Sequence, residues 1–137
     1  MKNALARSWN EEKGIFFYFQ NGRYYDTQDL KHCISERICR EFYWEESEWF
    51  IGLTDKNGVK IFEGDIVKIA LTKDYGFAGK FTDYHRAVIS FENGSFWFTT
   101  IPEINYQEKT TDCNWHFYNE QDRLIIGNIY ENPELLK

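Results

Sequence analysis

The stretch that decides the fold is Phe50-Ile51-Gly52-Leu53-Thr54-Asp55-Lys56-Asn57-Gly58-Val59-Lys60-Ile61-Phe62-Glu63-Gly64-Asp65-Ile66-Val67. Its Asn57-Gly58 pair lies between the apolar runs 50–53 and 59–62. A type I′ turn requires a positive φ at both central residues, which Gly adopts freely and Asn more readily than other residues with a Cβ. The stretch therefore predicts a β-hairpin. Gly64 predicts a bend or bulge at the start of a further strand, Asp65–Leu71.

Two more Asn-Gly pairs carry the same signal. Asn21-Gly22 and Asn93-Gly94 each separate two apolar or aromatic runs. Two-residue turns join antiparallel strands and cannot join parallel ones. We therefore expect hairpins at all three pairs and mostly antiparallel neighbours. The runs that flank the two pairs are 15–19, 23–25, 88–91 and 95–99.

The remaining chain contains weaker signals. Residues Arg123–Ile129 form an apolar run that ends before Asn132-Pro133, which predicts a last strand. A helix is predicted from about Gln28 to Arg40, with Thr27 as N-cap, although the β-branched residues there leave a strand open as the alternative. Polar, glycine-containing sequence from Thr72 to Asp83 predicts a long loop, and residues 101–122 predict another excursion.

The composition favours a mainly β protein. Phe 12, Tyr 9 and Trp 5 make 19% of the 137 residues, while Ala and Leu together number only 12. Aromatic and β-branched side chains suit a pleated, half-buried surface, whereas Ala and Leu favour helices. The length is close to that of one domain, and the apolar content excludes a disordered chain.

Charge and cysteine content narrow the class of protein. The net charge of −6 lacks the excess of Lys and Arg that non-specific binding to nucleic acid or anionic lipid requires. No window approaches the roughly 18 consecutive apolar residues of a membrane span, and the N-terminus lacks the apolar core of a signal peptide. Three cysteines, an odd number, suit a reducing compartment. We therefore expect a soluble, cytoplasmic protein.

Four segments resemble one family in the same order. Residues 50–67 resemble the block tGLkDKNGkeIyEGDIV of the YopX family of phage and prophage proteins. Arg7-Ser8-Trp9-Asn10 resembles the start of that family, Phe91–Phe96 its central hairpin, and Ile126–Leu135 its end, IGNIYENPEL. The chain departs from the pattern at Asn10, where the family often has Asp, and offers no anchor over residues 26–48.

The resemblance implies a mainly β fold, with an SH3-like β-barrel core built from antiparallel hairpins. It places one YopX-like domain over residues 1–137, with the barrel core roughly at 48–130 and an N-terminal strand or helix extension at 1–47. It also implies a phage or prophage protein in the host cytoplasm, and it carries over no catalytic residue, cofactor or metal. In this interpretation the block is a fold motif, in which Asp55 accepts hydrogen bonds from the amides of the turn.

Three groups of residues are candidate chemical sites. Asp55, Glu63 and Asp65 flank one hairpin, and Mg²⁺ sites use such carboxylates, but turn formation explains them better. Asp83 and His85 resemble a general base with its orienting carboxylate, yet no nucleophile signature accompanies them. The third group has part of the spacing of a zinc site. Structural zinc sites usually have two pairs of closely spaced ligands, which are missing here, so buried thiols that act as small hydrophobic side chains explain these cysteines better. It consists of His32, Cys33, Cys39, Cys113 and His116.

A nucleic-acid surface is the first alternative function. Residues 56–86 contain six basic and four acidic side chains, and Tyr75, Phe77, Phe81 and Tyr84 are interleaved with them. Aromatic side chains between basic ones allow bases to stack along a backbone-binding groove. The sequence therefore permits a single-stranded nucleic-acid binder that uses the 68–86 face, and a metal-dependent hydrolase at Asp55, Glu63 and Asp65 is the second alternative.

The preferred function is that of a non-enzymatic accessory protein that acts through protein contacts, with itself or with a phage or host protein. Residues 15–19 and 95–98 do not alternate apolar with polar, so some large side chains face away from the core. Trp97 points outward if Phe96 and Phe98 point inward. Two explanations of this second face are open. Either the N-terminal segment and residues 101–122 cover it within one chain, or it is a self-association surface with Trp97 as an anchor.

Overall fold

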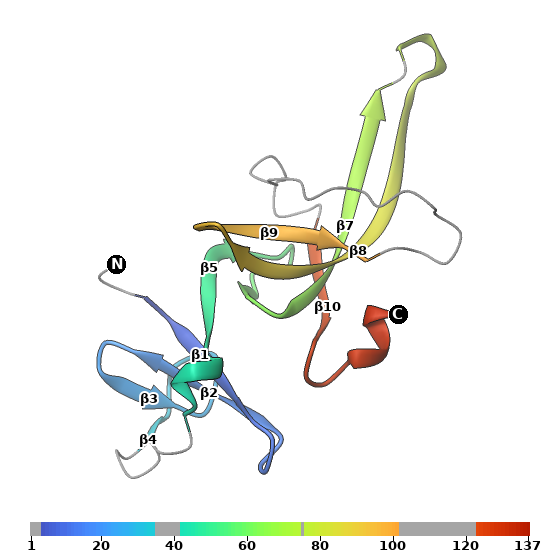
Figure 1. Cartoon of the computed structure of the whole chain (residues 1–137). Coiled ribbons are helices and arrows are strands. Elements are labelled where there is room, and N and C mark those ends of the chain that lie inside the picture. Colours follow the sequence, from blue (N-terminus) through green and yellow to red (C-terminus); the bar gives the residue numbers. More distant parts are fainter. Residues whose placement is uncertain (1–3, 35–41, 75, 102–122) are drawn as a thin grey trace. The chain divides into compact units, whose positions relative to one another are not determined.

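The computed structural model describes residues 4–34, 42–74, 76–101 and 123–137. The chain divides into two compact units, Met1–Phe50 and Ile51–Lys137. The described residues form ten β-strands and three short 3₁₀-helices, and they contain no α-helix. The expectation of a mainly β protein is confirmed (Figure 1).

The first unit is an antiparallel sheet with strand order β4-β3-β2-β1-β5. Its strands are β1 (Ala6–Asn10), β2 (Ile15–Gln20), β3 (Arg23–Tyr25), β4 (Cys33–Ile34) and the start of β5 (Glu48–Thr54). Neighbouring strands are joined in chain order from β1 to β4, and β5 then pairs with the free side of β1.

Strand β2 explains why its sequence does not alternate. Phe16, Phe17 and Tyr18 are all buried, although successive side chains of a strand point to opposite faces. Both faces of β2 are therefore covered. One face carries a hydrophobic core formed by Ala6, Phe17 and Phe42, against which Phe19, Tyr24 and Ile34 also pack.

The second unit contains a four-stranded antiparallel sheet with order β10-β7-β8-β9. These strands are β7 (Asp65–Asp74), β8 (Lys80–Glu92), β9 (Ser95–Thr100) and β10 (Arg123–Asn128). The short strand β6 (Lys60–Phe62) neighbours β5. One hydrophobic cluster forms the core of this unit: Ile61, Val67, Ile69, Ala87, Ile89 and Phe98, with Ile51, Leu53 and Ile125 packed against it.

The expected SH3-like barrel is not confirmed, because the described strands form open sheets. In the four-stranded sheet β9 and β10 lie at opposite edges, and no described strand bridges them. A barrel requires a hydrogen-bond ladder that returns to its first strand. Here β7 and β8 pair with each other in the middle of the sheet. Strand β9 pairs with β8 on one side and β10 pairs with β7 on the other, and the described ladder ends at these two strands.

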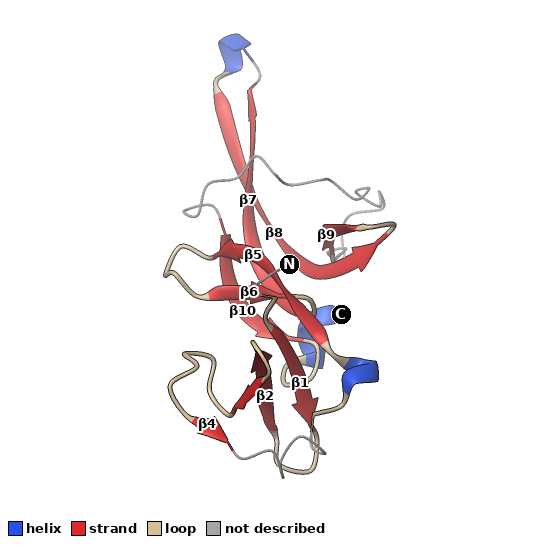
Figure 2. Ribbon diagram, turned by 90° about the vertical axis from the view of Figure 1, so that its left-hand side faces the viewer, coloured by secondary structure: helices blue, strands red, loops and turns tan. Residues whose placement is uncertain are grey.

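The predicted loop at 72–83 is wrong over most of its length. The pairing of β7 with β8 continues to Asp74 opposite Lys80, beyond the last β7 residue that pairs with β10, Ile69. The two strands form a ribbon that extends past β9 and β10 (Figures 1 and 2). A ribbon beyond the core requires no apolar face, so its sequence lacks the alternation that identifies a strand. Gly76 and Gly79 mark only its tip.

The predicted helix over 28–40 is wrong where the structure describes it. Leu30 has φ 58°, which no right-handed helix tolerates, and β4 follows at Cys33–Ile34. Asp29 organises the turn: its Oδ1 accepts hydrogen bonds from the Thr27 hydroxyl and from Lys31 N, and the Thr27 bond is the main reason that the pKa of Asp29 is lowered. A local side-chain turn has replaced the first helical turn. Residues 35–40 lie outside the described residues.

The hairpins predicted at the three Asn-Gly pairs are confirmed, with one difference in turn type. Asn21 and Asn93 have φ 51° and 52°, and each is followed by a glycine with positive φ, as a type I′ turn requires. In the third turn Gly58 has φ 77°, whereas Asn57 does not adopt a positive φ. That turn is a longer loop, closed by the hydrogen bond from Asp55 N to Val59 O at 2.8 Å.

No helix within the described ranges is long and apolar enough to span a bilayer.

Candidate functional site

Asp55 is the buried anchor of the central hairpin. The residue is 1% exposed, and its Oδ1 accepts hydrogen bonds from Asn57 N and Val59 N, each at 2.9 Å. Its Oδ2 accepts a third bond, from Ile125 N on β10 at 3.1 Å. The carboxylate therefore closes the turn and ties it to the C-terminal strand, which confirms the interpretation of Asp55 as an acceptor for turn amides.

Asp65, a second residue of the candidate magnesium site, is also buried and makes a structural contact. Asp65 is 3% exposed and accepts a hydrogen bond from Phe62 N through Oδ2 at 2.8 Å. Gly64, which lies between Phe62 and Asp65 in the chain, has φ 80° and makes the predicted bend, and its N–H donates to Ile89 O. Over the part of the chain that is described, no three His, Cys, Asp or Glu side chains are grouped closely enough to hold a metal ion.

The zinc and acid–base candidates are only partly described. Cys33 lies on the edge strand β4 and His32 directly precedes it, and both are exposed, so the expectation of a buried thiol is wrong for Cys33. Cys39, Cys113 and His116 lie outside the described residues. Asp83 and His85 occupy alternate positions of β8. No contact among the described side chains brings the zinc candidates together as a metal site or forms an acid–base site at His85.

The C-terminal motif Ile126–Leu135 comprises the end of β10, a hydrogen-bonded turn and most of the 3₁₀-helix η5 (Pro133–Leu136). Asn128 Oδ1 accepts hydrogen bonds from Tyr130 N and Glu131 N, and Asn132 N returns one to Asn128 O. A Cβ at Gly127 would lie 2.5 Å from Asn132 Oδ1, closer than any real contact allows. The glycine is therefore required by the close approach of Asn132, and the motif acts in folding.

We expect Gly127→Ala to lower the free energy of unfolding by about 2 kcal/mol, as overpacking of a tight site does. Urea denaturation measures this change. Asn132→Ala removes the two closest atoms that the new methyl group meets, Oδ1 at 2.5 Å and Cγ at 2.7 Å, and leaves the Cβ at 2.9 Å. If the clash is the cause, the double variant loses less stability than the two single losses add up to; simple additivity would contradict this assignment.

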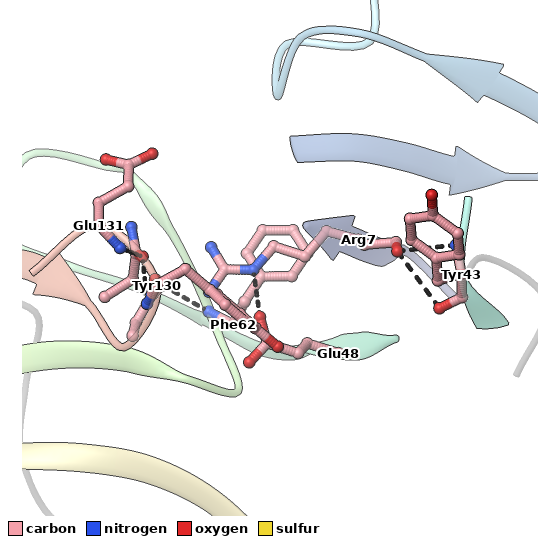
Figure 3. A network of polar contacts seen from close by, with 9 residues as sticks. Arg7, Tyr43, Glu48, Phe62, Tyr130 and Glu131 are labelled. Atoms are coloured by element: carbon pink, nitrogen blue, oxygen red, sulfur yellow. Dashed lines mark hydrogen bonds and ion pairs between the residues drawn. The ribbon is translucent and has the colours of Figure 1, made fainter. Parts of the chain in front are cut away.

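Arg7 and Glu48 form a buried ion pair in the first unit. Arg7 Nε donates to Glu48 Oε1 at 2.9 Å, and the two residues are 3% and 7% exposed. The Arg7 guanidinium also lies 4.1 Å from the centre of the Phe16 ring. The pair joins the facing strands β1 and β5, and Figure 3 shows the two side chains pointing toward each other.

Arg7, Ser8 and Asn10 of the motif Arg7-Ser8-Trp9-Asn10 each make a structural contact. The Ser8 hydroxyl accepts a hydrogen bond from Tyr43 N and donates one to Tyr43 O, so it fixes the segment that precedes β5 (Figure 3). Asn10 Oδ1 accepts a bond from Lys13 N in the β1–β2 turn. The sequence alone could not assign these roles, because the partners are remote or depend on the turn geometry.

Three large aromatic side chains of the first unit are exposed, and two of them lie on the same face of its sheet. Trp49 lies opposite Ala6, which lies opposite Phe19, so all three belong to the same face. Trp44, in the 3₁₀-helix η2 (Trp44–Glu46), packs on Phe19 with ring centres 4.8 Å apart. Tyr43, Trp44 and Trp49 are 46%, 45% and 38% exposed, and we call these three residues the aromatic surface.

Trp44 of the aromatic surface packs on a cluster of other aromatic rings. The ring centres of Trp44 and Phe42 are 4.6 Å apart with tilted planes, those of Tyr24 and Phe19 are 5.0 Å apart, and those of Tyr24 and Phe42 are 5.7 Å apart. Phe42 is 4% exposed. Each ring therefore has at least one packed neighbour, which holds Trp44 in place although nearly half of it faces solvent. The sequence showed aromatic residues here, but it could not show which would stay exposed.

The expected anchor Trp97 is less exposed than these residues. The register opposes Phe98 to the core residue Ile89, so Trp97 is on the other face of β9, as its position predicted. It is only half-buried, and its Nε1 donates to Glu92 O at 3.0 Å. The indole thus packs along its own hairpin.

On the 68–86 face the structure brings two of the proposed nucleic-acid contacts together. Lys68 Nζ lies 4.8 Å from the centre of the Tyr84 ring, and Tyr84 is 60% exposed. Arg86 is engaged elsewhere: its Nη1 donates to Leu135 O and its Nη2 to Lys137 O. Phe77, at the tip of the ribbon, is fully exposed.

Comparison with known proteins identifies the family of this chain. The YopX protein family matches residues 6–137. Among solved structures, the crystal structure of protein EF1440 from Enterococcus faecalis has a TM-score of 0.49 and 22% sequence identity, and the alignment covers 98% of each chain. Comparison with curated proteins gives no match. The family match covers nearly the whole chain and includes each motif whose folding role is described above, so this chain belongs to the YopX protein family.

Proposed function

We propose that the protein is a non-enzymatic accessory protein of a phage or prophage, acting in the host cytoplasm through protein–protein contacts at the aromatic surface. The observation that carries the proposal is the exposure of Tyr43, Trp44 and Trp49 in the first unit, where Trp44 packs on the same sheet face that carries Trp49. Trp and Tyr side chains held rigidly at a surface are typical anchors of protein interfaces. The partner is a second copy of the chain or a phage or host protein.

Three buried acidic side chains make contacts within the fold, which supports a structural rather than a catalytic role for them. The buried carboxylates of Asp55 and Asp65 accept hydrogen bonds from backbone amides, and the carboxylate of Glu48 is paired with Arg7. Groups fixed in this way hold the fold together. A general base or a metal ligand must instead present its oxygen atoms to a substrate or an ion.

The test compares variants of the aromatic surface with a matched control. Sedimentation at micromolar concentration measures self-association, and affinity capture from phage- or prophage-bearing cells measures binding to another protein. We expect Trp49→Ala with Tyr43→Ala to weaken the contact by roughly thirtyfold or more, as loss of an interface anchor does. Tyr84→Ala, an exposed aromatic residue of the second unit, serves as the control.

Three results would count against the proposal. The first is a monomer that captures no partner, the second is a contact that the aromatic variant leaves intact, and the third is a contact weakened equally by Tyr84→Ala. Thermal unfolding of each variant shows whether the fold is retained.

A second candidate function, binding of single-stranded nucleic acid, is favoured by the Lys68–Tyr84 pair on the 68–86 face. Phosphate contacts are strongest at low salt, so binding to short DNA or RNA must appear there first. Lys68→Ala with Tyr84→Ala is then expected to abolish it. Absence of binding even at low salt removes this candidate.

A further inference from the structure

The three Asn-Gly pairs that define the hairpins are also potential sites of chemical modification. In an Asn-Gly pair the backbone nitrogen of Gly can attack the side-chain amide carbon of Asn. All six residues of the pairs are exposed, and no glycine among them has a heavy atom within 4 Å of the position of a Cβ. Solvent access and sequence therefore do not distinguish the pairs, and any difference in reactivity must come from the structure.

The pair Asn57-Gly58 is held by hydrogen bonds on both residues. Gly58 N donates to Asp55 O at 2.9 Å, and Asn57 N donates to Asp55 Oδ1 at the same distance. The next residue of the chain, Val59, donates to the same carboxylate oxygen. Attack requires the Gly58 nitrogen to lose its proton and turn toward the Asn57 side chain, and both steps require this hydrogen bond to break.

The loop is also anchored outside the turn. Lys56 N donates to Arg123 O at 3.0 Å, and Arg123 Nε donates to Thr54 O at 2.8 Å. Asp55 Oδ2 accepts the further bond from Ile125 N. Opening of the Asn57 turn therefore disturbs β10 as well, so its local stability is high.

The other two pairs lack this protection. Within the described residues, neither Gly22 nor Gly94 donates its N–H to a hydrogen bond. Asn21 and Asn93 are in the left-handed region at φ 51° and 52°, a conformation that residues with a Cβ adopt only at a cost. Both are tips of two-residue hairpins, where local opening requires little free energy.

We propose that Asn21 and Asn93 are sites of spontaneous deamidation in the folded protein and that the hydrogen-bonded loop of Asp55 protects Asn57. The Gly nitrogen loses its proton and forms a bond to the Asn Cγ, and the side-chain amide leaves as ammonia. One water molecule then opens the cyclic imide to aspartate or isoaspartate. The reaction consumes water, releases ammonia and requires neither an oxidant nor an enzyme.

The modification changes the two hairpins in two ways. Each event adds one negative charge to a chain of net charge −6. Isoaspartate also inserts a methylene group into the backbone of a turn that has only two residues between the paired positions, Gln20 with Arg23 or Glu92 with Ser95. A lengthened turn no longer fits this register, so the hairpin ends are expected to separate.

The experiment follows the three sites in one sample. The intact protein is incubated under mildly alkaline conditions, and peptide mapping by mass spectrometry measures the conversion of each Asn. We expect Asn57 to react more slowly than Asn21 and Asn93 by roughly tenfold or more, since its hydrogen bonds must open first. In concentrated urea the three rates are expected to become similar.

Two variants make the assignment specific. Asn21→Gly keeps a sequence suited to a type I′ turn and is expected to remove modification at that site alone. Asp55→Asn weakens the loop and is expected to speed reaction at Asn57 without changing Asn93. The proposal is overturned if Asn57 reacts as fast as the other two in the folded protein. It is also overturned if Asn57 stays slow in urea, because local sequence would then explain the protection.

Discussion

Asp55→Ala is expected to lower the free energy of unfolding by about 3 kcal/mol, since the buried amide of Ile125 and two turn amides lose a charged acceptor. The alanine side chain cannot replace any of the three bonds, and the turn loses its link to β10. Urea denaturation of the variant and the wild-type protein measures the difference. Amide hydrogen exchange at Ile125 shows whether the loss occurs at this site.

Two control variants separate the role of the carboxylate from that of the turn sequence. Lys56→Ala changes an exposed neighbour in the same loop and is expected to alter stability by less than about 0.5 kcal/mol. Asp55→Asn keeps one acceptor oxygen for the turn but places an NH₂ group toward Ile125 N, so an intermediate loss is expected. If Asp55→Ala were as stable as Lys56→Ala, the carboxylate would not hold the hairpin.

Arg7→Met is expected to cost about 3–5 kcal/mol, because it leaves the Glu48 carboxylate buried without its charged partner. The arginine also loses its position over the Phe16 ring, so Arg7→Lys is expected to recover only part of the stability. Denaturant unfolding, monitored by far-UV circular dichroism, measures these losses.

The double variant Arg7→Met, Glu48→Leu removes both charges together. It is expected to be more stable than Arg7→Met alone, because a buried pair of apolar side chains leaves no uncompensated charge. Arg23→Ala, which removes an exposed arginine of the same sheet, is the matched control and should be nearly neutral. A double variant less stable than Arg7→Met would show that Glu48 is stabilised by other contacts.

Local backbone chemistry made the hairpins predictable. A positive φ is a property of single residues, so Asn21-Gly22 and Asn93-Gly94 determine type I′ turns wherever the flanking strands form. The same is true of Gly64, whose φ of 80° makes the bend between β6 and β7. The excess of aromatic residues and the turns together predicted an antiparallel, mainly β protein with no knowledge of remote contacts.

Residues 28–34 and the ribbon show where local sequence was insufficient. The Thr27–Asp29 turn and Leu30 in the left-handed region replaced the helix that the apolar spacing predicted. The ribbon of β7 and β8 is held by pairing between two strands rather than by an apolar face, so periodicity could not identify it.

The sequence by itself therefore determined the three reversals, the antiparallel strand pairing and membership of the YopX family. Tertiary structure alone decided that the described strands form open sheets, that Arg7 is buried beside Glu48, and that Trp44 stays exposed where Trp97 is half covered. The physical reason is the range of the interactions. A turn depends on adjacent residues, whereas burial, ion pairing and exposure depend on strands that are far apart in the chain.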